Sequence, residues 1–148
     1  TSILKVPVDP LVPQDSIYCP IRISCVYERN VQHSFDANGT CELDVTVKLC
    51  HNIIPNTVHD DLEFVFEAKN KLKSKTANDF VWLGETTKQF IGDENSLKVG
   101  EVVTATLKVL FYRKGVHDIN TFSVTIRGDD GQERLFRFEN DQYMVEVL

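Results

Sequence analysis

Long apolar runs are missing from this sequence, and so is a basic leader. The apolar stretches cover only a few residues each, far fewer than the roughly 18 residues that a membrane-spanning helix requires. No basic segment followed by an apolar one stands at the N-terminus, as it would in a secretory signal peptide. We therefore expect no direct membrane insertion. Because the chain starts at Thr1 and its lone methionine is Met144, we expect it to be a piece of a larger protein.

Positive charge is also scarce. Sixteen basic side chains stand against 22 acidic ones, which gives a net charge of -6. A general nucleic-acid or anionic-membrane binder needs the opposite sign, so we expect no nucleic acid among the partners. Seven glycines and five prolines among 148 residues exclude a collagen-like repeat, and 42% hydrophobic residues can fill the core of one domain.

Catalytic motifs are absent as well. The sequence contains no nucleophile elbow, no phosphate-binding loop and no dinucleotide fingerprint. Cys50 and His51 are adjacent, but neighbours on a strand point to opposite faces, so we interpret them as a core thiol and an exposed imidazole. The histidines lack the spacing of metal ligands. We therefore predict no enzyme, no catalytic residue, no metal and no cofactor.

Four cysteines lie in the first third of the chain, and no two of them form a C-x-x-C pair. This spacing gives no support to a zinc or thioredoxin-like site. Four thiols in a chain of this length are also fewer than a disulfide-dependent scaffold would contain. We interpret them as reduced core thiols, and they are Cys19, Cys25, Cys41 and Cys50.

Strict alternation of apolar and polar residues is what the sequence does contain. From Cys41 to Leu49 every second residue is apolar, and a strand places all of these on one side. Comparable segments recur about every ten residues and no helix pattern occurs, which predicts an all-β sandwich or barrel. Residues 1–15 carry three prolines and are expected to form a linker or edge lead-in. Residues 16–148 are expected to form the single β-sandwich domain.

Several segments carry more specific expectations. Residues 17–27 alternate around Pro20, which favours an edge strand or a bulged one. Residues 80–83 are apolar on both faces, which suggests the middle of a sheet. The strands at 116–119 and 122–126 leave open one continuous strand through Asn120. Asn38-Gly39 indicates a turn in which positive φ is tolerated.

Four lysines occupy every second position after residue 68. They form either a docking patch on one strand face or a solvated loop that protects an edge strand from aggregation, and we prefer the loop. Exposed edges are also places where sandwiches bind partners by strand addition. The lysines of this candidate interaction patch are Lys69, Lys71, Lys73 and Lys75.

Three short motifs resemble a known family. They are a Trp-Leu-Gly segment, a Leu-x-x-Gly-Glu turn in which Val99 replaces the usual Pro, and a Gly-Val-His-Asp-Ile-Asn segment in which His117 replaces the usual Tyr. They resemble the C-terminal sandwich region of large subunits of the transport protein particle (TRAPP) complexes, in particular the TRAPP II subunit family of the NIK- and IKK-beta-binding protein and the yeast 120-kDa subunit. The motif residues are Trp82, Gly84, Gly100, Glu101, Gly115, His117, Asp118 and Asn120, within residues 80–124.

The resemblance implies an immunoglobulin-like antiparallel β-sandwich of about eight strands. It implies a non-catalytic scaffold or interaction domain in a cytoplasmic, Golgi-associated vesicle-tethering complex that acts as a Rab exchange factor. Its partners would be other protein subunits of that complex, with Rab GTPases engaged only indirectly. In sandwiches of this kind a corner tyrosine hydrogen-bonds the backbone, and we expect a ring nitrogen of His117 to take over part of that role.

Two other classes compete with this interpretation. The sequon Asn38-Gly39-Thr40 and the even cysteine count favour an extracellular immunoglobulin-like or fibronectin-like adhesion or receptor module. The missing leader and the position of Trp82 after all four cysteines disfavour it. A small sandwich hydrolase is the third hypothesis, and no motif supports it.

Overall fold

The computed structural model describes residues 19–51, 61–70, 80–128 and 131–148. The expected lead-in at residues 1–15 lies outside the described residues. Within them the chain forms eleven strands, more than the eight expected, because several are only two to four residues long. The strands are β2 (Ile21–Val26), β3 (Asn30–Val31), β4 (Cys41–His51), β5 (Glu63–Ala68), β6 (Phe80–Leu83), β7 (Thr87–Phe90), β8 (Val102–Phe111), β9 (Gly115–Asp118), β10 (Phe122–Arg127), β11 (Glu133–Arg137) and β12 (Met144–Val147).

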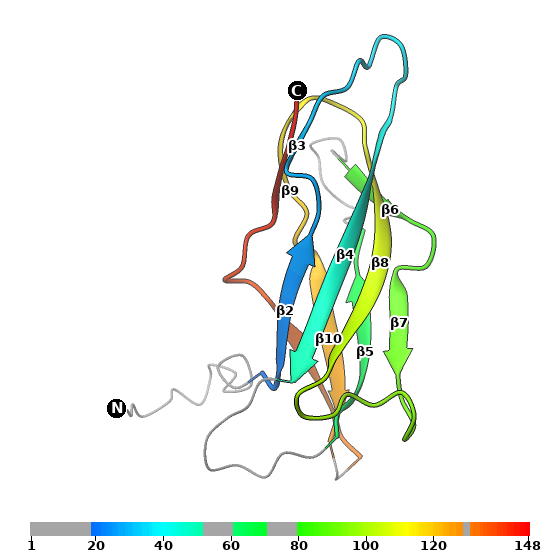
Figure 1. The fold of residues 1–148 in the computed structure, drawn as a ribbon, viewed down its shortest axis with the longest axis vertical. Helices are drawn as coiled ribbons and strands as arrows, with labels where there is room; N and C mark the ends of the chain where they lie inside the picture. Colours follow the sequence, from blue (N-terminus) through cyan, green and yellow to red (C-terminus); the bar gives the residue numbers. More distant parts are fainter. Residues whose placement is uncertain (1–18, 52–60, 71–79, 129–130) are drawn as a thin grey trace, which may run out of the picture.

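The strands form two four-stranded sheets and a small third one. The first sheet has the order β2-β4-β8-β6 and the second the order β11-β10-β5-β7, and Figure 1 shows them as two layers. Every pairing within these two sheets is antiparallel. The third sheet, β3-β12-β9, contains the parallel pair β3–β12. The predicted all-β antiparallel sandwich is confirmed, with this one parallel pair as an addition.

The longest pairing joins β4 and β8, from Cys41 opposite Phe111 to Cys50 opposite Val102. Along β4 the exposure alternates as the sequence predicts, so that Val45, Val47 and Leu49 are fully buried and their neighbours face outward. The β2 strand lies at the edge beside β4, which confirms the edge position predicted around Pro20.

The core lies between the inner faces of the two four-stranded sheets. Val109 and Phe111 of β8 are fully buried, and so are Phe66 of β5 and Val124 of β10. Aromatic rings connect the layers, with the rings of Trp82 and Phe122 centred 5.4 Å apart. Burial of this apolar surface is the main stabilising contribution, at about 25 cal/mol per Å².

The β6 strand lies at an edge, so its predicted position in the middle of a sheet is wrong. It pairs with β8 alone among the described strands. The strand is apolar on both faces for two reasons. On the inner face Trp82 points into the core. On the outer face Val81 lies opposite Leu110, and Val81 and Leu110 are each half-buried. Local packing on the outer face, and not a second neighbouring strand, accounts for the apolar residues.

The chain leaves one sheet for another around Asn120, so a continuous strand from 116 to 126 is not formed. The β9 strand pairs with β12, whereas β10 pairs with β5 and β11. Between them Thr121 N–H donates to the carbonyl of Ile119 at 2.9 Å, which makes a tight turn. This turn carries the chain from the small third sheet into the second four-stranded sheet.

Two further expectations need correction. His51 is buried and Cys50 is only half-buried, the reverse of the assigned roles. His51 occupies the next odd-numbered position of β4, and the odd-numbered side chains of this strand are buried. Its position in the strand therefore predicts the burial of His51 better than the polarity of its side chain does. A turn does precede β4, but it runs from Ser34 to Asn38 and ends before Gly39 of the Asn38-Gly39 pair that was expected to form it, and Gly39 does not adopt positive φ.

We expect Trp82→Ala to lower the free energy of unfolding by about 3–5 kcal/mol, as truncation of a buried aromatic side chain does. Trp82 is 3% exposed and its indole N–H donates to Thr121 Oγ1 at 2.8 Å. Urea denaturation measures the change. Trp82→Phe loses the hydrogen bond and part of the ring volume but keeps an aromatic ring in the core, so it should cost less. A wild-type midpoint for the alanine variant would contradict this core position.

Candidate protein-interaction site

The three family-like motifs lie at both ends of β8 and do not form one site. The Gly100-Glu101 turn immediately precedes β8, and the segment beginning at Gly115 follows its end. Ten residues of strand separate them, which corresponds to roughly 30 Å. The first and third motifs do meet, because the Trp82 indole bonds Thr121 beside Asn120. The motifs therefore identify turns and a corner, and any binding site must be assembled from other groups.

The Asp118 carboxylate organises the corner between β9 and β10. Its Oδ1 accepts the backbone N–H of Asn120 at 3.0 Å and that of Tyr143 at 3.1 Å. A carboxylate that accepts two backbone donors makes charge-assisted bonds, which are stronger than neutral ones. One side chain thereby connects the corner to the start of β12.

Asn120 extends the same connection. Its side-chain N–H₂ donates to the carbonyls of Phe138 and Asp141, each at 2.6 Å. Its Oδ1 accepts the backbone N–H of Phe122 at 3.4 Å. Because the amide uses both its donor and acceptor groups within the fold, Asn120 acts as a structural clamp between the corner and the 138–143 loop.

His117 occupies the corner position at which the motif resemblance led us to expect a residue that replaces tyrosine. The side chain is 5% exposed, and its Nε2 donates to the carbonyl of Arg113 at 3.1 Å. Its ring lies 4.9 Å from the ring of Phe111. The geometry agrees with the expected substitution, since a ring nitrogen bonds the backbone four residues upstream.

The Leu-x-x-Gly-Glu motif forms a tight turn at the start of β8. Glu101 N–H donates to the carbonyl of Lys98, and the Glu101 carboxylate accepts Lys98 N–H in return. Gly100 has φ of +84°, as the third position of a type II turn requires. Proline is favoured at the second position of that turn, where this chain has Val99. Gly84 and Gly115 also adopt positive φ next to strand ends.

Of the lysine patch, Lys69 alone falls within the described residues, and Lys71, Lys73 and Lys75 lie outside them. Lys69 is exposed and directly follows β5, which is an internal strand of its sheet. It borders an open pocket of about 410 Å³ that Asn70, Ser123, Arg137 and Glu139 also line. The pocket has both cationic and anionic walls, so its chemistry selects no ligand class.

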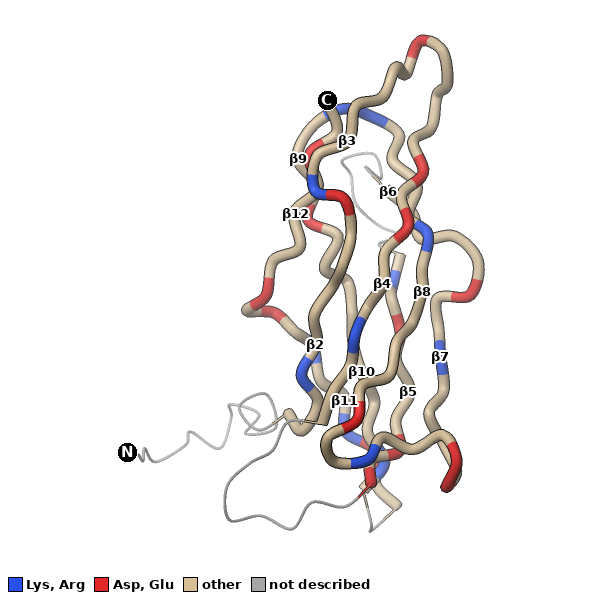
Figure 2. The backbone as a smooth tube through the Cα atoms, in the orientation of Figure 1, with Lys and Arg blue, Asp and Glu red and all other residues tan. Residues whose placement is uncertain are grey.

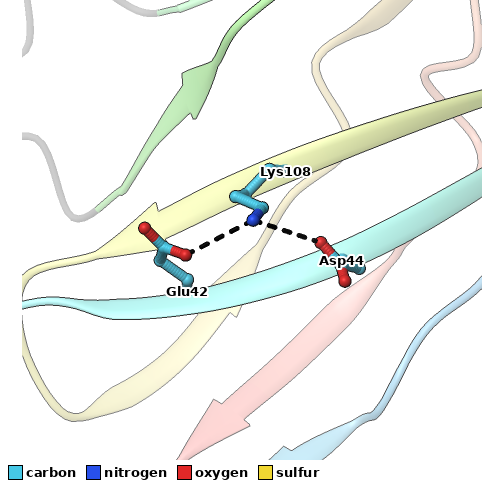
Figure 3. Close-up of polar contacts among 3 residues, drawn as sticks. All are labelled: Glu42, Asp44 and Lys108. Atoms are coloured by element: carbon cyan, nitrogen blue, oxygen red, sulfur yellow. Dashed lines mark ion pairs between the residues drawn. The ribbon is translucent and has the colours of Figure 1, made fainter.

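An exposed ion cluster crosses β4 and β8. Lys108 Nζ lies 3.4 Å from the Glu42 carboxylate and 3.9 Å from that of Asp44, as Figure 3 shows. Such exposed cross-strand pairs stabilise by about 0.2–1 kcal/mol each. Figure 2 shows acidic and basic residues interspersed along the strands. Sequence analysis missed this cluster because the register of β4 on β8 was needed to find it.

Cys25 and Tyr143 form a hydrogen-bonded thiol–phenol pair beside β2. Burial raises the pKa of the Cys25 thiol to about 12, the Asp141 carboxylate adds to this, and the bond to Tyr143 partly offsets it. Burial likewise raises the pKa of the Tyr143 phenol. Since the thiolate is the nucleophilic form, a thiol with so high a pKa is unreactive at neutral pH. None of the four cysteines, all of which lie in the described residues, is in a disulfide.

Within the ranges that the structure covers, no three His, Cys, Asp or Glu side chains gather as metal ligands. Of the four histidines, His59 lies outside those ranges. The same described part of the chain has no helix with the length and apolarity to cross a membrane.

Comparison with known proteins places most of the chain in one family. Residues 20–128 match the family model described as the TPPC8 C-terminal Ig-like domain. A search of curated proteins finds no match. Among solved structures, the chain is similar to a FixG-related protein from Vibrio parahaemolyticus, with 15% identity, a TM-score of 0.42, and coverage of 86% of this chain and 96% of that one.

We expect Asp118→Ala to lower the free energy of unfolding by about 2–3 kcal/mol, because two backbone donors lose a charged acceptor. Chemical denaturation measures the loss. Asp44→Ala is the matched control, since its carboxylate is 76% exposed and contacts only Lys108 at 3.9 Å, and it should change stability by less than about 1 kcal/mol. Equal effects of the two substitutions would contradict the structural role of Asp118.

We expect the protein to lose stability as pH rises above about 9. The ordinary pKa of a cysteine thiol is 9.0, and that of Cys25 in the fold is raised to about 12. Between these values the unfolded chain loses a proton that the folded chain retains, so unfolding becomes more favourable. Urea titrations from pH 8 to 10.5 measure the decline. Cys25→Ala should reduce its slope, and an unchanged slope would contradict this assignment.

Proposed function

The chain belongs to the family of TPPC8 C-terminal Ig-like domains, and from this premise we propose that it is a non-catalytic protein-interaction module of a TRAPP-complex subunit. The single observation that carries the proposal is the family match over residues 20–128. A module of this kind would hold subunits together in a vesicle-tethering, Rab-exchange complex at the Golgi, in the cytoplasm. Rab GTPases would be engaged by other subunits.

The use of the motif residues supports a scaffold role. Backbone groups of the turns and the corner are hydrogen-bonded by the polar side chains of Asp118, Asn120 and Glu101. His117 bonds a backbone carbonyl in the same way. Groups engaged in this manner stabilise a rigid framework, and the partner contacts fall to the outer faces and edges of the sheets.

The parent subunit is proposed to be of the TPPC8 type, a TRAPP III subunit. The motif resemblance to the TRAPP II family of the NIK- and IKK-beta-binding protein covers residues 80–124, whereas the family match covers residues 20–128. Both assignments agree on the class of complex. Family membership also favours a trafficking subunit over an extracellular adhesion module, and the sequon that suggested the latter has a local role, since Asn38 Oδ1 accepts Thr40 N–H at 3.2 Å.

We expect deletion of this module from its parent protein to reduce recovery of at least one other TRAPP subunit when the parent is captured from cells. Quantitative mass spectrometry of the captured complexes measures the loss. The Trp82→Ala variant serves as a folding-defective comparison and the Asp44→Ala variant as a folded one. Unchanged recovery of every subunit after deletion would contradict the proposal, and the identities of the recovered subunits distinguish TRAPP III from TRAPP II.

The isolated chain is expected to leave GDP release from Rab GTPases unchanged. Fluorescent-nucleotide release with and without an excess of the chain measures this directly. Acceleration by the chain alone would mean that it carries exchange chemistry itself and would overturn the non-catalytic assignment.

A further inference from the structure

The two four-stranded sheets have four edge strands, namely β2, β6, β7 and β11. An edge strand presents unpaired backbone N–H and C=O groups, which can bind another strand. What lies against each edge therefore indicates where this domain can pair with another chain.

Side chains from elsewhere in the fold bond backbone groups of two of the four edge strands, β2 and β6, and a third edge strand, β7, is linked to the other sheet by a side chain of its own. Tyr143 O–H donates to the carbonyl of Ile23 in β2 at 3.4 Å. The Asn70 side-chain amide accepts Trp82 N–H in β6 at 2.7 Å and donates to the Trp82 carbonyl at 3.4 Å. Lys88 of β7 donates to the carbonyl of Thr104 in β8 at 2.9 Å, which bridges the two sheets along that side.

The β11 edge differs from these three. Gly128 N–H donates to the carbonyl of Gln132 at 2.8 Å and closes the hairpin with β10. Hydrogen-bonded pairs alternate along antiparallel strands, so residues 134 and 136 bond to β10, and residues 133, 135 and 137 direct their backbone groups away from it. Within the described residues, no other strand or side chain bonds these outward groups of Glu133, Leu135 and Arg137.

The side chains at these three positions share one face and are exposed, with Leu135 48% accessible. An acid, an apolar residue and a base thus follow each other at every second position. Such a strand is complementary to itself when it is reversed, because the acid then lies opposite the base and the apolar residue opposite its own copy. A two-fold interface requires this kind of self-complementarity.

We propose that a second copy of this chain pairs with β11, antiparallel and about a two-fold axis through Leu135. Glu133 then lies opposite Arg137 of the copy, Leu135 opposite Leu135, and Arg137 opposite Glu133. On the other face Arg134 lies opposite Phe136 of the copy. The pairing joins the two β11-β10-β5-β7 sheets into one continuous sheet of eight strands.

Charge argues for a copy as the occupant. Two chains of net charge -6 repel each other over most orientations, so association depends on a contact where opposite charges meet. The reversed β11 pair supplies two Glu–Arg contacts around a central apolar pair. This interface goes beyond the proposed function, because it would bring two parent subunits together, and it can hold or fail independently of any TRAPP partner.

Sedimentation equilibrium of the 148-residue chain from low micromolar to millimolar concentration tests the proposal, and we expect a monomer–dimer equilibrium. Arg137→Glu should raise the dimer dissociation constant by roughly tenfold or more, because both cross-strand pairs become like-charged. The double variant Glu133→Arg, Arg137→Glu should restore it. Lys48→Glu, on an exposed position of β4, makes the same change in net charge and should have little effect.

Amide hydrogen exchange on the wild-type chain gives a second readout that needs no variant. Protection of the amides at 133, 135 and 137 should rise with protein concentration, whereas the amides at 134 and 136 should be protected at all concentrations. A chain that stays monomeric at millimolar concentration overturns the proposal. A dimer that is indifferent to Arg137→Glu, or that lacks the alternating protection, also overturns it.

Discussion

The pairing of β4 with β8 is the constraint on which the rest of the fold depends. Ten consecutive residue pairs place every second side chain of both strands on the same inner face. Because side chains alternate with a period of two, a slip of one residue would move this whole apolar set into solvent. The flanking strands β2 and β6 take their own registers from these two central strands, and the second sheet covers the face that they create.

Where the chain passes between the small third sheet and the second four-stranded sheet, polar side chains and not apolar packing fix its path. The chain crosses between sheets after Asp118 and again between β11 and β12, and Asp118 and Asn120 join these two crossings through bonds to the 138–143 segment. A crossing leaves backbone groups without a ladder partner, and buried or half-buried groups of this kind need another acceptor or donor. The motif that resembles the TRAPP family is therefore explained by the needs of a corner.

Local alternation was enough to predict the strands and the all-β class, since Cys41–Leu49 and Val103–Phe111 show the period of two without interruption. Alternation was not enough to predict which strands lie at the edge of a sheet and which lie in its middle, as the edge position of Phe80–Leu83 shows. Alternation itself would have placed His51 correctly, but the polarity of the imidazole argued against the core. The Lys108 cluster and the bonds of Asp118 to Tyr143 join residues that are distant in sequence, so only the tertiary register brings them together.

The engagement of two sheet edges, β2 and β6, by single side chains has a consequence for the protein in a crowded cell. Asn70 and Tyr143 each bond the backbone of an edge strand through one or two polar bonds, which contribute little to folding free energy. Their larger effect is to prevent neighbouring chains from pairing with these edge strands during synthesis and storage. The side chains of Asn70 and Tyr143 therefore guard against association of chains along these two edges, whereas those of Val45 and Phe66 hold the core of the domain together.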